Sequence, residues 1–267
     1  MPATPATPTT PPIAPIAPIA IVLAAGKGTR MGGDLPKVLF EAAGKPLVRW
    51  VLDALAAAGV SDRIVVVGYR GELVKQALAD LPGVSFALQT EQRGTGDAVA
   101  AAAELLRARL AADPAESRRP VVIVCGDSPM LRPESVTGLL EQFAARGAAC
   151  LLGTAVTDDP SGLGRIVRAT DGRFQKIVEQ KDATAAERAI HEVNMSTYVF
   201  EARDLLRALA GLGNANASGE YYLTDCPGLL LQEGSVVDAV ACLDQSETLS
   251  VNTPEQLAVV SQALRQR

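Results

Sequence analysis

Short apolar runs alternate with longer amphipathic segments along most of the chain. Apolar runs rich in β-branched residues predict strands, at residues 21–25, 63–67, 85–88, 121–125, 149–155, 164–168, 194–200 and 236–241. Segments with a helical apolar period predict helices at 47–58, 71–80, 96–110, 133–146, 202–209, 224–233 and 253–267. Strands separated by helices indicate βαβ units, so we expect an α/β fold with a Rossmann-like, doubly wound and mainly parallel sheet.

The alternation changes after about residue 150. Residues 161–178 are predicted to form a hairpin that turns at Asp171-Gly172. We expect this half of the chain to add a small mixed β layer that covers the site and holds a second substrate. Ligands of open α/β sheets bind beyond the carboxyl ends of the strands, so the site residues are expected to follow strands.

The chain has 267 residues, and residues 20–267 are expected to form one domain. Residues 1–19 are Pro/Ala/Thr repeats and predict a disordered or polyproline-like tail, because repeated prolines block helix and sheet. This tail has neither a charged start nor a continuous apolar stretch, which argues against a signal peptide. The apolar runs are all shorter than a membrane span.

Charge and cysteine usage narrow the class of partners. The net charge is −5 and no basic block is present, which argues against nucleic acid and against an anionic membrane surface. The four cysteines are widely spaced, without a C-x-x-C pair, which favours free thiols in a reducing cytoplasm over a zinc or disulfide framework. The oligomeric state is not predicted.

Residues 21–37, IVLAAGKGTRMGGDLPK, carry the strongest chemical signal. A strand runs directly into a loop with four glycines, and three cations (Lys27, Arg30 and Lys37) lie in the same segment. Exposed N–H groups of a glycine-rich loop form a concave anion site, and cations add charge where phosphates would lie. The spacing is neither that of a P-loop nor that of a Rossmann fingerprint. The segment predicts a nucleotide site of another kind.

Three further segments are candidates on their residues alone. Asp127 follows Gly126 and a buried strand, a position suited to Mg²⁺ but also to a helix-capping or turn residue. Asn252 precedes the last helix and offers either a metal oxygen or an ordinary helix start. Gln89 stands before a glycine-containing loop and can donate to and accept from a base edge, although such a loop also begins many ordinary helices.

Several motifs together resemble those of the sugar-nucleotide pyrophosphorylases. The match begins with L-A-A-G-x-G-T-R-M at 23–31 and L-P-K at 35–37. It continues with Q-x-x-x-x-G-T-G at 89–96, G-x-G-R-I at 162–166, G-E-Y-Y-x-T-D at 219–225 and V-N at 251–252. From residue 20 to about 260 the chain resembles the uridylyltransferase domain of the bacterial N-acetylglucosamine-1-phosphate uridylyltransferases.

The resemblance implies a nucleotidyltransferase that joins UTP and N-acetylglucosamine 1-phosphate, with Mg²⁺ and without a protein nucleophile. Arg30 and Lys37 would be catalytic, and Asp127 and Asn252 would hold the metal. The nucleotide-binding residues would be Leu23, Ala24, Ala25, Gly26, Gly28, Thr29, Gln89, Gly94, Thr95 and Gly126. The sugar-binding residues would be Thr95, Gly164, Glu179, Asn194 and Tyr222.

The chain departs from this family in three places. Hexapeptide repeats of a C-terminal β-helix are not seen, so acetyltransferase function is expected to be absent. Asn194-Met195-Ser196 replaces N-T-G, and Cys125 stands where the family often has tyrosine. The last two departures leave the identity of the sugar substrate open. Two alternatives remain: transfer involving glucose 1-phosphate, dTTP or CTP, and an inactive sugar-nucleotide-binding regulatory domain. The sole histidine, His191, lies in no catalytic triad pattern, which disfavours a hydrolase.

Overall fold

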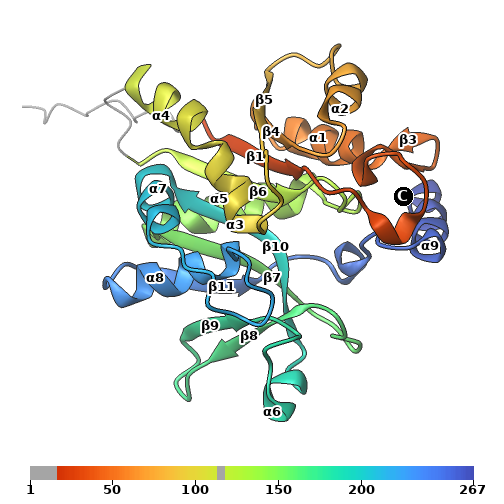
Figure 1. Ribbon diagram of the computed structural model, residues 1–267. Coiled ribbons are helices and arrows are strands. Elements are labelled where there is room, and N and C mark those ends of the chain that lie inside the picture. Colours follow the sequence, from red (N-terminus) through yellow and green to blue (C-terminus); the bar gives the residue numbers. More distant parts are fainter. Residues whose placement is uncertain (1–16, 113–117) are drawn as a thin grey trace, which may run out of the picture.

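The computed structural model describes residues 17–112 and 118–267 and has a large central sheet (Figure 1). Its strands are β1 (Ile19–Ala24), β4 (Asp62–Val67), β5 (Val84–Leu88), β6 (Pro120–Cys125), β7 (Cys150–Val156), β8 (Gly164–Arg168), β9 (Phe174–Val178), β10 (Glu192–Glu201) and β11 (Val237–Ala241). They lie in the order β11-β7-β10-β6-β1-β4-β5, and the β8–β9 hairpin joins through β10. Neighbours are parallel except at β10, β8 and β9, as predicted for a mainly parallel sheet with a small mixed layer.

Helices cover both faces of the sheet. The helices are α1 (Leu47–Ala57), α2 (Gly71–Ala77), α3 (Thr95–Ala101), α4 (Ala103–Ala112), α5 (Pro133–Arg146), α6 (Ala185–Arg188), α7 (Ala202–Ala210), α8 (Cys226–Gln232) and α9 (Pro254–Gln266). One buried cluster joins α3, α4, α7 and α8 to the sheet, and a second joins α1, α2 and α5 to its other face. Helix α9 packs near the short β2 (Glu41–Ala42) and β3 (Lys45–Pro46). The predicted doubly wound architecture is confirmed.

The hairpin predicted over 161–178 is present as β8 and β9, which project with α6 below the sheet in Figure 1. The backbone N–H of Ala169 donates to Arg173 O at 2.8 Å across the turn that contains Asp171-Gly172. Residues Val193 and Asn194 of β10 pair with Arg165 and Gly164 of β8. The hairpin therefore continues the sheet away from its parallel half.

Some predicted boundaries were wrong. The helix predicted over 96–110 is two helices, α3 and α4, because Ala102 forms a tight turn in which its N–H donates to Val99 O at 3.0 Å. The helix predicted over 224–233 begins with the short 3-10 helix η3 (Leu223–Asp225), and α8 follows with Pro227 in its first turn. Strand β1 starts at Ile19, two residues early, because Ile19 pairs with Asp62 and Val121.

The predicted tail falls almost wholly on residues 1–16, outside the described residues, and the division into tail and domain stays a prediction.

The structure also contains elements that the pattern did not predict. Helix α6 begins with a capping box, in which Thr184 and Glu187 bond each other's backbone N–H. Four residues are too few for a helical period to be recognised.

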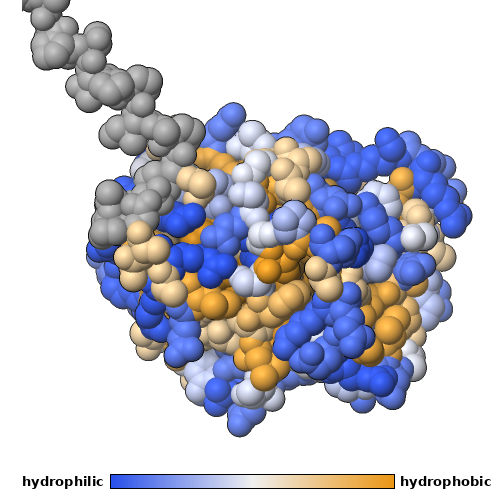
Figure 2. Space-filling model, turned by 90° about the horizontal axis from the view of Figure 1, so that it is seen from above, coloured by the Kyte–Doolittle hydropathy of each residue, from blue (hydrophilic) through white to orange (hydrophobic). Residues whose placement is uncertain are grey.

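The described surface carries few large exposed apolar side chains: Leu35, Leu88, Val156, Val236 and Val259. They come from five separate segments, and on the face seen in Figure 2 hydrophobic side chains are interrupted by hydrophilic ones. Single exposed apolar side chains are ordinary on a protein surface. Within the described residues, none of the helices has the length and apolarity needed to span a bilayer.

Candidate active site

The predicted phosphate loop leaves the carboxyl end of β1 and folds back on itself. Gly28 has φ +67° and lies against Lys37, so that a Cβ at Gly28 would be 2.6 Å from Lys37 Cβ. Thr29–Met31 then form a 3-10 turn, η1, and Lys37–Leu39 form a second one, η2. Only glycine allows this backbone conformation and this approach together. The fold of the loop therefore sets where the Lys37 side chain points.

The predicted catalytic and metal residues meet in one cluster. The Lys37 ammonium donates to Asn252 Oδ1 at 2.7 Å and forms an ion pair with Asp127 Oδ2. An Arg30 guanidinium nitrogen donates to the same Asn252 oxygen at 3.0 Å. The segments that follow β1 and β6 and the segment before α9 are thus brought together, although Asn252 is more than 200 positions from Lys37 and Arg30 in the sequence. Side chains that the sequence places far apart form a single charged site.

Asn252 is held in one orientation. Its side-chain NH2 donates to Ser250 Oγ at 3.2 Å, and its backbone N–H donates to Gln256 Oε1 at 2.7 Å. The amide oxygen is therefore left to face Lys37 and Arg30. Such second contacts are what keep a neutral oxygen aimed at a cation.

The oxygens of Asp127 and Asn252 converge on one cation, the Lys37 ammonium. One carboxylate and one amide oxygen suit Mg²⁺, which prefers a few protein oxygens and completes its shell with phosphate and water. Among the described residues no group of three or more His, Cys, Asp or Glu side chains could hold a metal by itself. A metal held by the two oxygens of Asp127 and Asn252 would complete its shell with phosphate and water.

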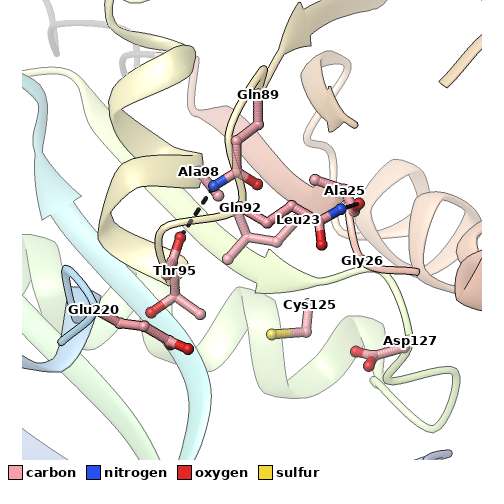
Figure 3. A pocket seen from close by; sticks show the side chains of 11 residues that line it. Leu23, Ala25, Gly26, Gln89, Gln92, Thr95, Ala98, Cys125, Asp127 and Glu220 are labelled. Atoms are coloured by element: carbon pink, nitrogen blue, oxygen red, sulfur yellow. Dashed lines mark hydrogen bonds between the residues drawn. The ribbon is translucent and has the colours of Figure 1, made fainter. Parts of the chain in front are cut away.

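A cavity of about 320 Å³ opens beside the cluster (Figure 3). Its lining residues are Leu23, Ala25, Gly26, Gln89, Gln92, Gly94, Thr95, Ala98, Cys125, Asp127 and Glu220. The segments that follow β1, β5 and β6 all contribute, and Asp127 lies at the end nearest the Lys37 cluster. Parallel strands end at one edge of the sheet, which is where an α/β fold binds its ligands.

Gln89 is buried at the upper side of this cavity, with 6% of its surface exposed. Its side-chain NH2 donates to Gly94 O at 3.2 Å and to Asp97 Oδ2 at 2.8 Å. Its side-chain oxygen has no partner in these bonds and can accept from a base N–H. A fixed amide of this kind can recognise the edge of a base.

The loop that carries Gly94 and Thr95 is clamped by the segment around Tyr221. Tyr221 N–H donates to Arg93 O, and Gly96 N–H donates to Tyr221 O, both at 2.8 Å. The φ of Gly94 is +115°, and a Cβ there would be 2.5 Å from Tyr221 O, so the position requires glycine. Leu223 N–H donates to Thr95 Oγ1 at 3.1 Å. The G-T-G and G-E-Y-Y motifs therefore form one structural unit.

Three of the predicted sugar-binding residues lie together on the small β layer. Asn194 pairs with Gly164 between β10 and β8, and a Cβ on Gly164 would be 3.4 Å from Asn194 Cβ and 3.6 Å from Glu179 Oε2. Thr224 donates its hydroxyl to Glu179 Oε1 at 3.2 Å, and Asn194 donates to the Tyr198 hydroxyl at 2.7 Å. Burial raises the pKa of the Glu179 carboxyl. The missing side chain of Gly164 thus lets Ile177 and the two hydrogen-bonding side chains pack close to the strand.

Arg165 stabilises the strand that carries Gly164. Its guanidinium is 2% exposed and donates to Gln180 Oε1 at 2.8 Å and to the carbonyl of Leu163. Burial lowers the pKa of Arg165. The bond to Gln180 ties the start of β8 to the residue after Glu179, so it fixes the spacing of the two sides of the cluster.

The remaining predicted residues do not line the cavity. Ala24 is 1% exposed and packs in the apolar core, and Gly126 donates its N–H to Leu23 O at 2.8 Å behind the cavity. Thr29 starts η1, and Tyr222 is half-buried before η3. Their roles stay predictions.

Four lining residues were not assigned to the site from the sequence: Gln92, Ala98, Cys125 and Glu220. Gln92 and Glu220 lie within motifs that were recognised, at 89–96 and 219–225. The sequence could therefore have predicted that these two residues line the site. Gln92 donates its NH2 to Ala25 O at 2.8 Å and so links β1 to the loop after β5. Burial, with the Asp127 charge as a smaller cause, raises the pKa of the Cys125 thiol to about 12.

The family model described as the MobA-like NTP transferase domain matches residues 20–219. The bifunctional protein GlmU of Geobacter metallireducens is 44% identical over 247 residues, which are 92% of this chain and 50% of that protein. GlmU of Exiguobacterium sibiricum is 43% identical, over 92% of this chain and 53% of that protein. The chain spans about half the length of these curated relatives.

A crystal structure of UDP-glucose pyrophosphorylase complexed with UDP-glucose is similar in fold, with a TM-score of 0.72 at 14% identity. The match covers 94% of this chain and 99% of that chain. At this identity the likeness concerns the fold, which is the Rossmann-like α/β fold predicted from the sequence. The matched family model covers most of the chain and all three strand ends that form the cavity. The chain therefore belongs to the MobA-like NTP transferase domain family of nucleotidyltransferases.

Proposed function

We propose that this chain transfers UMP from UTP to N-acetylglucosamine 1-phosphate and releases pyrophosphate. The observation that carries the proposal is the convergence of Arg30, Lys37, Asp127 and Asn252 at one end of a cavity whose other walls hold Gln89 and Thr95. Identity of 42–44% to GlmU proteins, over the half of their length that this chain spans, supports the same choice of substrates.

In the proposed reaction an oxygen of the sugar phosphate attacks the α-phosphorus of UTP in line. The new P–O bond forms as the bond from the α-phosphorus to the β-phosphate oxygen breaks, and pyrophosphate carries the electron pair away. Arg30 would neutralise the departing pyrophosphate, and Lys37 would bridge the sugar phosphate and the α-phosphate. No side chain needs to act as a nucleophile, so catalysis consists of positioning and charge stabilisation.

We propose that Asp127 and Asn252 hold Mg²⁺, since their oxygens already face a common cation. The bound ion would supply positive charge to the triphosphate and help to orient it. The Lys37 ammonium would then exchange its bonds with Asp127 and Asn252 for phosphate oxygens. Lysine suits such an exchange because its ammonium is a compact charge on a flexible chain.

Gln89 and the Gly94–Thr95 loop would bind the uracil, and Gly164, Glu179 and Asn194 would bind the sugar. We also propose a cytoplasmic location, which is supported by the four cysteines, all of them free thiols in the structure. UTP and the sugar 1-phosphate are the proposed partners.

The test is a pyrophosphate-release assay with Mg²⁺ in which UTP, dTTP and CTP are each paired with N-acetylglucosamine 1-phosphate and with glucose 1-phosphate. We expect UTP with N-acetylglucosamine 1-phosphate to have the highest kcat/KM. Faster turnover of another pair would replace the proposed substrates. Absence of turnover with every pair, in a chain that still binds UDP-N-acetylglucosamine, would favour the regulatory alternative.

A further inference from the structure

Ser196 has a backbone conformation that is uncommon for its residue type. Its φ is +51°, in the left-handed region, where among the described non-glycine residues only Ala43 and Arg70 join it. A side chain in this region costs free energy relative to glycine, and such outliers gather at functional sites. The conformation of Ser196 therefore indicates a functional role.

A β-bulge produces this conformation. The pairing of β10 with β7 shifts register between Asn194 and Thr197, so Met195 and Ser196 are left without partners on β7. The backbone N–H of Ser196 donates to Asn194 Oδ1 at 3.2 Å, and the same Asn194 donates to Tyr198. The bulge thus links Ser196 to a proposed sugar-binding residue.

On its other side, β10 runs antiparallel to β6, with Tyr198 opposite Ile123. The pairing with β6 ends there, and Ser196 lies near enough to Cys125 for its side chain to act on the pKa of the thiol. Cys125 lines the cavity, and Ser196 is itself partly exposed. The Ser196 side chain therefore lies beside a residue that lines the cavity.

Ser196 has neighbours that would bind the two ends of the proposed substrate. Cys125 is close enough to Asp127 and Lys37 for their charges to act on its thiol, so the phosphates would be on that side. Asn194, which would bind sugar hydroxyls, accepts a hydrogen bond from the backbone N–H of Ser196. In a sugar 1-phosphate the ring substituent beside the phosphate is the one on carbon 2, an acetamide in N-acetylglucosamine and a hydroxyl in glucose.

We propose that Ser196 is a specificity-determining residue whose hydroxyl hydrogen-bonds the acetamide on carbon 2 of the sugar 1-phosphate. This inference rests on the proposed function and deepens it. A site that bonds a polar substituent discriminates against analogues that lack it, because its own polar group is then left unpaired.

The test compares Ser196→Ala, which keeps the Cβ and removes the hydroxyl, with Ser196→Gly, which also relieves the backbone strain. In both variants we expect KM for N-acetylglucosamine 1-phosphate to rise about tenfold, the loss of one hydrogen bond. KM for UTP and kcat/KM for glucose 1-phosphate should stay within about threefold, as a loss confined to the acetamide contact requires. Ser196→Gly should melt at or above the wild-type temperature.

Ala43→Gly is the matched control, since Ala43 has the same φ of +51° in the turn between β2 and β3. It should leave both KM values unchanged. Wild-type turnover combined with an unaltered KM for N-acetylglucosamine 1-phosphate in both Ser196 variants would overturn the role of Ser196 alone. A rise in KM that is equal for both sugars would also overturn it, because the acetamide would not be the group contacted. Absence of wild-type turnover with any substrate pair would instead overturn the proposed function and this inference with it.

Discussion

Lys37 is the residue on which most of the proposed chemistry depends. Its ammonium is bound by a carboxylate and an amide oxygen that belong to segments 90 and 215 positions away. It is only 15% exposed, so its charge is screened less than that of a surface lysine. A positive charge fixed at this point is worth more to a charged transition state than a mobile one.

We expect Lys37→Ala to lower kcat by at least about a hundredfold to a thousandfold, as the loss of a transition-state contact does elsewhere. Lys27→Ala is the control, because the Lys27 ammonium lies over the Tyr69 ring, 5.1 Å from its centroid, and not in the cluster. Its kcat should change less than tenfold, on the order expected for a peripheral charge. Steady-state pyrophosphate release measures both. Equal losses in the two variants would remove the special role of Lys37.

Cys125 gives a second test at this scale. Because its pKa is raised from 9.0 to about 12, its thiolate fraction at a given pH is roughly a thousandfold lower than that of an ordinary thiol. We expect iodoacetamide to modify Cys125 very slowly at pH 8, and the rate to keep rising with each added pH unit up to pH 10. Peptide mass spectrometry of a time course measures it. Rapid modification at pH 8 would contradict the assigned environment.

At this scale the sequence predicted much of the site. Arg30, Lys37, Asp127 and Asn252 were all named, but through resemblance, since spacing alone cannot show that residues more than 200 positions apart meet. Ser196 and Cys125 were recognised as departures from the family without a role. The position of Ser196 depends on a bulge in β10, which no local sequence pattern predicts.

At the scale of elements, the backbone conformation of the phosphate loop positions the side chains of the site. Gly28 combines a φ of +67° with close contact to Lys37, and Gly94 combines a φ of +115° with close contact to Tyr221. In each case a loop that follows a strand is pressed against another segment of the site. Because Gly28 and Gly94 have no side chain, Lys37 and Tyr221 can lie directly against their backbones.

Gly28→Ala should lower kcat/KM by about tenfold to a hundredfold, because the added Cβ would displace Lys37 and misplacement of about 1 Å has costs of that order. Gly59→Ala is the matched control: its φ is +80°, and nothing lies within 4 Å of an added Cβ. Both variants bear left-handed strain that costs about 1 kcal/mol of stability, and Gly28→Ala should lose more than Gly59→Ala because its Cβ also clashes with Lys37; urea unfolding measures both. Only Gly28→Ala should lose activity. Full activity of Gly28→Ala would show that the contact does not position Lys37.

The strands were well predicted because buried β-branched runs such as that of β6 have few alternatives. The break between α3 and α4 was missed because it falls in an alanine-rich segment without glycine or proline. The contact of the hairpin with β10 was also beyond the pattern. It depends on pairing between segments about 30 residues apart.

At the scale of the whole molecule, the doubly wound sheet brings distant motifs to one edge. The parallel strands β1, β5 and β6 end at the cavity, and the antiparallel β10 carries the sugar-side residues next to β6. A ligand that spans both halves would bind only the folded chain. Its binding free energy would then add to the stability of the fold.

We expect UDP-N-acetylglucosamine with Mg²⁺, at a hundred times its Kd, to stabilise the chain by about 2.7 kcal/mol and to raise Tm by about 5–11 °C. UDP-glucose at the same concentration should give a smaller shift. Asp127→Asn should lose the part of the shift that depends on Mg²⁺ and keep the rest. A thermal-unfolding series measures this, and a shift that is independent of Mg²⁺ in the wild-type chain would argue against the proposed metal site.

The most direct test of the account is a crystal structure of the chain with UDP-N-acetylglucosamine and Mg²⁺. We expect the uracil against Gln89 and Gly94, the sugar within hydrogen-bonding distance of Glu179 and Asn194, and the metal bound by Asp127. Density for the nucleotide outside this cavity, or with its uracil and sugar ends exchanged, would contradict the central claim.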